Sequence, residues 1–276
     1  MADTMLRGEP LRANTVRHVG GVYGRSLLAQ IRAITEYPAD FWVMASAGVM
    51  WNVLQFAFIT VLFNAVPDVA GWRYHEMLML SGLLIVASGS TALLCDGVWS
   101  TGTYVLKGEI DYRITRPAPV VVQVATSHIG MQGFGEVGVG LVVVAYGWIG
   151  AGMGAAAIPA GVLGLACAIV IECSLITMLS AVCFWIKGTN SVFAFVMLDL
   201  QHNAMTLPLG LFPAAVRIVT MFVLPVAFVN FVPVAVLTGH LGPWWLIGPP
   251  VAAAASALGA LGVYRLGLRS YDSSGH

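Results

Sequence analysis

Long apolar runs separated by short polar clusters dominate the chain. A helix needs about 20 apolar residues to cross the hydrocarbon core of a membrane, which is about 30 Å thick. Five runs satisfy this length with few charges or none, and they are Phe41 to Phe63, Met77 to Cys95, Val120 to Ile149, Ile158 to Ile186 and Trp244 to Tyr264. The pattern predicts an all-α integral membrane protein in which Pro249 and Pro250 interrupt the last run, as membrane helices tolerate.

The stretch from Ser191 to Leu237 is ambiguous. It holds either one span with a partly inserted segment or two spans separated by Pro208 and Pro213. With six spans in all, 11 of the 13 basic residues fall on one side and only Arg73 and Arg217 on the other. Because cytoplasmic loops are rich in Lys and Arg, we expect six transmembrane helices with both termini cytoplasmic. The sixth span would follow a re-entrant hairpin around residues 214–237.

The segment before the first run has helical periodicity. Its apolar stripe is Leu27, Leu28, Ile31 and Ile34, and the residues off the stripe are Arg25, Gln30 and Arg32. This pattern predicts an amphipathic helix in the plane of the membrane surface, serving either as an anchor or as a moving part. The expected parts are therefore a tail with this interfacial helix (1–40), a transmembrane domain (41–266) and a cytoplasmic C-terminal tail (267–276).

Composition supports the membrane assignment and excludes several functions. Hydrophobic residues make up 58% of the chain and charged residues only 9%, whereas soluble domains carry about a quarter charged residues. No dense block of Lys or Arg exists, so we expect no nucleic-acid partner. The four cysteines lie in apolar runs without C-x-x-C spacing, so neither a metal site nor a disulfide framework is expected.

A cluster of charges lies between the second and third runs. Residues 107–117 carry five charges of both signs, which usually means a solvated loop. Ile110 and Ile114 would nevertheless share a helical face, so the alternative is a short helix that docks into a groove of a partner. The candidate docking residues are Lys107, Gly108, Glu109, Ile110, Asp111, Arg113, Ile114, Arg116 and Pro117, and those of the separate interfacial helix are Arg25, Leu28, Ile31 and Arg32.

A few ionisable residues fall at or near membrane depth. A bare charge there costs several kcal/mol, so each must be paired, protonated or exposed to water. The candidates are Glu136, Glu172, Asp199 and His202, with His128 as a further partner. Three readings stay open for them, namely a proton relay, contact with a substrate, or neutral carboxyl groups hydrogen-bonded between helices.

The sequence lacks the motif that would bind ATP. A P-loop requires Gly-Lys followed by Ser or Thr, but Lys107 and Lys187 are each followed by glycine. The match to G-x-G-x-x-G at residues 133–138 follows no predicted strand. We attribute Gly133, Gly135, Gly138 and Gly140 to close helix packing instead. Any ATP hydrolysis would therefore take place on another polypeptide.

Four local patterns occur in order along the chain. They are Glu36-Tyr37-Pro38-Ala39-Asp40-Phe41, Gly71-Trp72-Arg73-Tyr74-His75-Glu76, Gly108-Glu109-Ile110-Asp111 with Arg116-Pro117, and Leu268-Arg269-Ser270-Tyr271-Asp272-Ser273-Ser274-Gly275. Together they resemble the type-2 ABC exporter permeases, and within them the bacterial ABC-2 family transporter proteins. Ile110 stands where that family more often has leucine, and the glutamate-bearing 133–140 stretch has no match in its pattern.

This resemblance implies a non-catalytic permease subunit in a bacterial plasma membrane. It also implies the six spans, the interfacial helix, a cytoplasmic coupling helix after the second span and the re-entrant hairpin. The implied partners are a dimer of ABC ATPase subunits, which bind ATP and Mg²⁺ in place of this chain, a second permease subunit, and membrane lipid. The alternative function is a proton-coupled secondary transporter that uses the intramembrane carboxyl groups.

Overall fold

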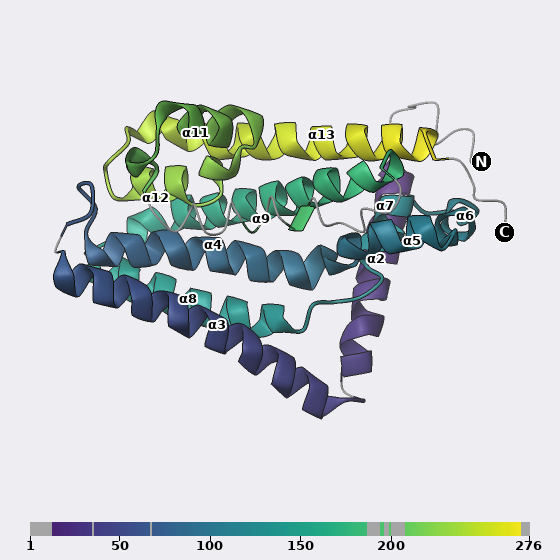
Figure 1. Ribbon diagram of the computed structural model, residues 1–276, viewed down its shortest axis with the longest axis horizontal. Coiled ribbons are helices and arrows are strands. Elements are labelled where there is room, and N and C mark those ends of the chain that lie inside the picture. The colour runs from purple at the N-terminus through teal and green to yellow at the C-terminus, as the bar shows by residue number, and fades with distance from the viewer. Residues whose placement is uncertain are drawn as a thin grey trace.

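The computed structural model describes residues 13–34, 36–66, 68–186, 194–195, 199 and 208–271 (Figure 1). Its long helices are α2 (Ala13–Ile34), α3 (Pro38–Ala65), α4 (Tyr74–Cys95), α8 (Gln132–Gly150), α9 (Ile158–Ala181) and α13 (Gly248–Arg269). Its short helices are α5 (Thr101–Leu106), α6 (Glu109–Ile114), α7 (Val120–Ala125), α11 (Ala214–Ile218) and α12 (Phe231–Leu237). Within these described ranges the only β pairing is the isolated bridge between Val69 and Trp72.

Single-turn helices extend or link these elements. They are the 3-10 turns η1 (Asp96–Ser100), η2 (Ala155–Ala157), η3 (Val182–Phe184), η4 (Leu209–Leu211), η6 (Val226–Phe228) and η7 (Pro243–Ile247), and the π turn η5 (Val219–Val223). With these extensions, the apolar helical segments long enough to cross a membrane are Pro38–Ala65, Tyr74–Leu106, Gln132–Gly150, Ala155–Phe184 and Pro243–Arg269. The predicted all-α, multi-pass membrane fold is confirmed.

The five apolar segments run alongside one another, and α2 crosses one end of the bundle (Figure 1). α4 is the central helix, because it contacts α3, α8, α9 and α12. Within an apolar stretch of 18 residues in its span, 72% of the residues are buried, whereas in the corresponding stretch of α8 only 22% are. The additional span expected between residues 191 and 213 falls largely outside the described residues, so the count of six stays a prediction.

Two expectations about the spans are wrong. The run from Val120 to Ile149 is not one helix, because α7 ends at Ala125 and α8 begins at Gln132. In the break, the amide of Gly130 donates to the carbonyl oxygen of Ala92 on α4 at 3.0 Å, which replaces a bond within the helix. The second error concerns Pro249 and Pro250, which do not interrupt the last span. They lie in the first turn of α13, where the missing N–H group costs no hydrogen bond.

The segment expected to form a hairpin contains α11, η5, η6 and α12, which gather at one end of the bundle (Figure 1). α12 packs against α9 and α4, and its Val234 and Ala235 are buried. Phe222 and Val223 of η5 are exposed instead. One arm of this segment is thus covered by protein, while the other presents an apolar surface.

Glycines hold α4 and α8 together. A Cβ atom on Gly133 would lie 2.5 Å from the carbonyl oxygen of Gly89, and one on Gly140 would lie 3.1 Å from that of Gly82. Small residues permit this close approach of two membrane helices. The predicted packing role is confirmed for Gly133, Gly135 and Gly140, which are buried, but it is wrong for Gly138, which has open space around it.

We predict that Gly133→Leu separates α4 from α8. The added side chain cannot avoid the backbone of Gly89, and overpacking of this kind typically costs about 1–3 kcal/mol. The matched control is Gly138→Leu, because a Cβ atom on Gly138 meets no atom within 4 Å. Thermal unfolding in detergent should show a lower midpoint for the first variant alone. Equal midpoints for the two variants would contradict the close contact.

Candidate functional site

A left-handed glycine starts the short helix α6. Gly108 has φ +69° and lies directly before Glu109, the first residue of α6. Residues with a Cβ atom adopt this conformation at a cost of about 1–2 kcal/mol, whereas glycine adopts it freely. The turn at Gly108 separates α6 from α5, so that the charged segment forms a helix of its own at the end of the bundle (Figure 1).

The two isoleucines of α6 differ in exposure, which corrects the expectation of a shared docking face. Ile110 is fully buried in a cluster with Val105, Val124 and Phe184, whereas Ile114 is 43% exposed. Ile110 therefore anchors the helix to its own chain. The sequence pattern correctly indicated a short amphipathic helix, but its buried side faces this protein.

The outer surface of α6 mixes apolar and charged groups. Tyr112 and Ile114 are exposed large apolar residues, and Leu106 lies exposed just ahead of the helix. Lys107, Glu109, Arg116 and Pro117 are also exposed. The Nη2 atom of Arg116 donates to the hydroxyl oxygen of Tyr112 at 2.8 Å. This hydrogen bond, together with the charge of Arg116, lowers the pKa of Tyr112.

Arg113 and Gln123 clamp α6 to α7. The guanidinium of Arg113 lies 4.1 Å from the ring centroid of Tyr104 on α5, and its Nη1 atom donates to the carbonyl oxygen of Gln123 at 3.1 Å. In return, the Nε2 atom of Gln123 donates to the carbonyl oxygens of Arg113 and Ala118 at 2.9 and 2.7 Å. Sequence reasoning missed Gln123, although it is the one polar residue in the apolar run from Val120 to Ala125.

A chain of polar side chains continues from this clamp to the end of α4. The hydroxyl of Tyr104 donates to Ser127 Oγ at 3.0 Å, and Ser127 Oγ lies 3.3 Å from His128 Nδ1. His128 Nε2 lies 3.2 Å from Asp96 Oδ2. His128 thus pairs with Asp96 of η1, a residue that sequence reasoning missed, and this corrects the expected pairing with Glu136, Glu172 or Asp199.

The interfacial helix α2 attaches to the same region through polar groups. Its Tyr23 hydroxyl donates to the carbonyl oxygen of Leu94 at 2.6 Å, and Gln30 Nε2 donates to the carbonyl oxygen of Ser127 at 2.8 Å. Leu28 and Ile31 of the predicted apolar stripe remain about half exposed. Arg25 and Arg32 are exposed as well. Tyr23 and Gln30 of α2 therefore face the protein, while Leu28 and Ile31 face outward.

The C-terminal end of the last span completes this site. Tyr264 and Tyr271 pack against Phe184, with ring centroids 5.3 and 6.2 Å apart, in the same apolar cluster as Ile110. Burial raises the pKa of Tyr271, and the negative charge of Asp111 adds to this effect. α6 is consequently tied to the basic end of α13 as well as to α5 and α7.

The candidate residues at membrane depth lie on different helices. Glu172 is buried on α9, and Glu136 is partly buried on α8, where its side chain borders Gly48 of α3 and Gly89 of α4. Asp199 is exposed, and His202 lies outside the described residues. Within the described part of the chain, no group of three His, Cys, Asp or Glu side chains gathers closely enough to hold a metal ion.

The opposite end of the bundle has its own polar contact. His240 Nε2 lies 3.0 Å from Glu76 Oε2, and the ring of His240 stacks on that of Trp72 at 4.4 Å. Glu76 Oε2 also accepts a hydrogen bond from the amide of Arg73 at 2.9 Å. The loop before α4 is thereby held against the loop after α12.

A family model described as ABC-2 family transporter protein matches residues 49–275, well over half of the chain. The chain belongs to this family. No curated protein and no solved structure matches the sequence. The match runs from the middle of α3 beyond the end of α13 and includes the whole of α6 with its clamp.

In this ABC-2 transporter protein, we predict that Gln123→Ala loosens α6. Removal of the amide leaves the carbonyl oxygens of Arg113 and Ala118 without this donor, a loss of about 1–2 kcal/mol. Tryptic cleavage after Lys107 and after Arg113 should become faster, because the protease needs a locally opened backbone. Gln55→Ala on α3 is the matched control. Cleavage rates that match those of the wild type would show that the clamp does not fix α6.

Proposed function

We propose that this chain is the permease subunit of an ATP-driven exporter, and that α6 is its contact with a separate ABC ATPase subunit. Membership of the ABC-2 transporter family supports the permease role. The observation that carries the rest is the division of α6 into two sides. Ile110 is buried against the protein, while Tyr112, Ile114 and Glu109 are presented outward.

The inner side of α6 suits the transmission of force. Ile110 packs with residues from the ends of several helices, namely Val105, Val124, Phe184 and Tyr264. A packed cluster moves as a unit more readily than it deforms. A push on α6 would therefore displace the ends of α5, α7, α9 and α13 together, and the polar chain through Ser127 would carry the motion to α2.

The outer side of α6 suits a protein partner. An exposed tyrosine beside an isoleucine, bordered by charges of both signs, provides an apolar contact with orienting groups around it. Hydrolysis of ATP, with its Mg²⁺, takes place on the partner in this proposal. A second permease subunit, identical or different, would complete the translocation path.

We place the α6 end of the bundle in the cytoplasm of a bacterial cell and the Trp72 end outside. Lys107, Arg113 and Arg116 lie at the first end, as does the basic end of α13, while Arg73 and Arg217 lie toward the other (Figure 1). This arrangement follows the positive-inside rule. A sixth span over the residues between α9 and α11, and re-entry of the α11 to α12 segment from the outside, complete the proposed topology.

The double variant Tyr112→Ala/Ile114→Ala should lose coupling while it stays folded, because both side chains are exposed. We expect the amount of co-purified ATPase subunit, identified by its P-loop sequence, to fall about tenfold, which corresponds to about 1.4 kcal/mol. Tyr146→Ala/Ile218→Ala is a control, since these residues are also exposed but lie toward the other end. Undiminished co-purification would refute the role of α6, and protonophore-sensitive transport by the purified chain alone would favour a proton-coupled transporter.

Single-cysteine labelling should locate the two ends. Arg116→Cys and Ser270→Cys should react with a membrane-impermeant maleimide only after the cells are opened, whereas Asp68→Cys should react in intact cells. All three positions are exposed. Because three of the four native cysteines are buried, the labelling of the wild-type chain measures the background signal. Reaction of Ser270→Cys in intact cells would overturn the cytoplasmic location of the C-terminus.

A further inference from the structure

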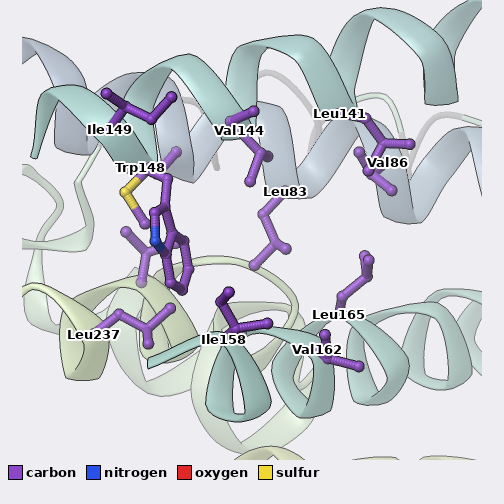
Figure 2. Close-up of a pocket in the computed structure, with 14 residues that line it drawn as sticks. Leu83, Val86, Leu141, Val144, Trp148, Ile149, Ile158, Val162, Leu165 and Leu237 are labelled. Atoms are coloured by element: carbon purple, nitrogen blue, oxygen red, sulfur yellow. The ribbon is translucent and has the colours of Figure 1, made fainter. Parts of the chain in front are cut away.

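A groove with an apolar lining opens between α8 and α9. Its volume is about 360 Å³, and its floor is formed by α4, while α12 borders one end (Figure 2). Met79, Leu83 and Val86 of α4 belong to the lining, as do Val144 and Trp148 of α8 and Leu165 of α9. None of the side chains that line the groove is charged.

The groove lies within the membrane-spanning part of the fold. All of its walls except α12 belong to apolar segments long enough to cross a membrane. Ile149, Ile158 and Val162 on its rim are exposed on the outside of the bundle. Whatever enters the groove therefore arrives from the hydrocarbon region of the bilayer, where water is absent.

The lining differs from the contacts between helices of this protein. α4 and α8 meet through Gly82, Gly89, Gly133 and Gly140, as membrane helices that pack closely generally do. In contrast, branched aliphatic side chains and Trp148 dominate the groove, so that a helix backbone cannot approach its floor closely. A thin, flexible hydrocarbon chain fits such a surface better than a second copy of this protein.

We propose that this groove binds one acyl chain of a membrane phospholipid. Along α8 the lining runs from Leu141 to Ile149, about 12 Å at about 1.5 Å per residue, which accommodates part of one chain. The lipid headgroup lies at the Trp148 end, because tryptophan favours the depth of the headgroups. Binding relies on van der Waals packing, since leaving the bilayer gains no hydrophobic free energy.

This site is independent of the proposed ATPase coupling, and its test needs only the purified full chain. The chain would be reconstituted in vesicles of dioleoylphosphatidylcholine containing a small fraction of the same lipid with a photoreactive diazirine in one acyl chain. After illumination, mass spectrometry of peptides would locate the adducts. We expect enrichment on Val144, Trp148 and Leu165 over Leu54 and Val61 of α3, which are more exposed to the bilayer.

Gly161→Leu is the variant that fills the groove. A Cβ atom at Gly161 would already lie 3.0 Å from the Trp148 ring and 3.9 Å from Leu237 Cδ1. Adducts in the groove should fall about fivefold through loss of packing with the chain, while those on α3 stay unchanged. Gly262→Leu on α13 is the matched control, because a Cβ atom there meets nothing within 4 Å.

Leu165→Phe is the second filling variant, used if size-exclusion chromatography shows that Gly161→Leu does not fold. Loss of groove adducts in a folded filling variant, but not in Gly262→Leu, supports the acyl-chain site. Uniform labelling of the groove and α3 overturns the proposal, as do groove adducts that persist in both filling variants. A Trp148→Cys variant that forms a disulfide-linked dimer on oxidation, while the wild type does not, would assign the groove to a contact between two copies of the chain instead.

Discussion

The close contact between the backbones of α4 and α8 determines where the rest of the protein lies. In a bilayer, lipid tails are as apolar as the side chains, so the hydrophobic effect does not bring helices together. Van der Waals contact between closely fitting surfaces must do so, and the glycines at 82, 89, 133 and 140 permit it. Because α4 then continues through η1 into α5, this contact also sets the position from which α6 projects.

The site around α6 uses a different kind of interaction. Its inner anchor is the buried Ile110 cluster, and its flanks are held by the hydrogen bonds of Arg113 and Gln123. Hydrogen bonds are directional and therefore fix an orientation, whereas apolar packing fixes a position. The two together make a six-residue helix rigid, although a helix of that length is unstable in isolation.

The sequence predicted the spans well, because the thickness of the bilayer alone sets the length of an apolar run. It also located α6 and α2 by their periodicity. It failed at the break between α7 and α8, since the partners of Gly130 and His128 are Ala92 and Asp96, which are more than 30 residues away. Local pattern carries no information about such distant partners.

The error on α6 has a clear physical origin. Periodicity shows that Ile110 and Ile114 can share a face, but not whether that face meets this chain or a partner. On α2 the apolar stripe was identified, and its Leu28 and Ile31 stay about half exposed while Tyr23 and Gln30 hold the helix to the protein. In a membrane protein, apolar surface is suited to lipid as much as to protein, so hydrophobicity alone cannot assign an inside.

The same reasoning separates the surfaces that this chain offers to protein from those it offers to lipid. Where two of its helices meet closely, small residues let the backbones approach; where the lining is bulky, as beside Trp148, a groove remains whose surface suits a flexible chain. The size of the side chains at an apolar surface thus indicates whether that surface contacts protein or lipid, whereas their hydrophobicity does not. Applied to α3, whose outer face carries exposed Trp42, Trp51 and Phe58, this criterion favours contact with lipid over close packing against another helix.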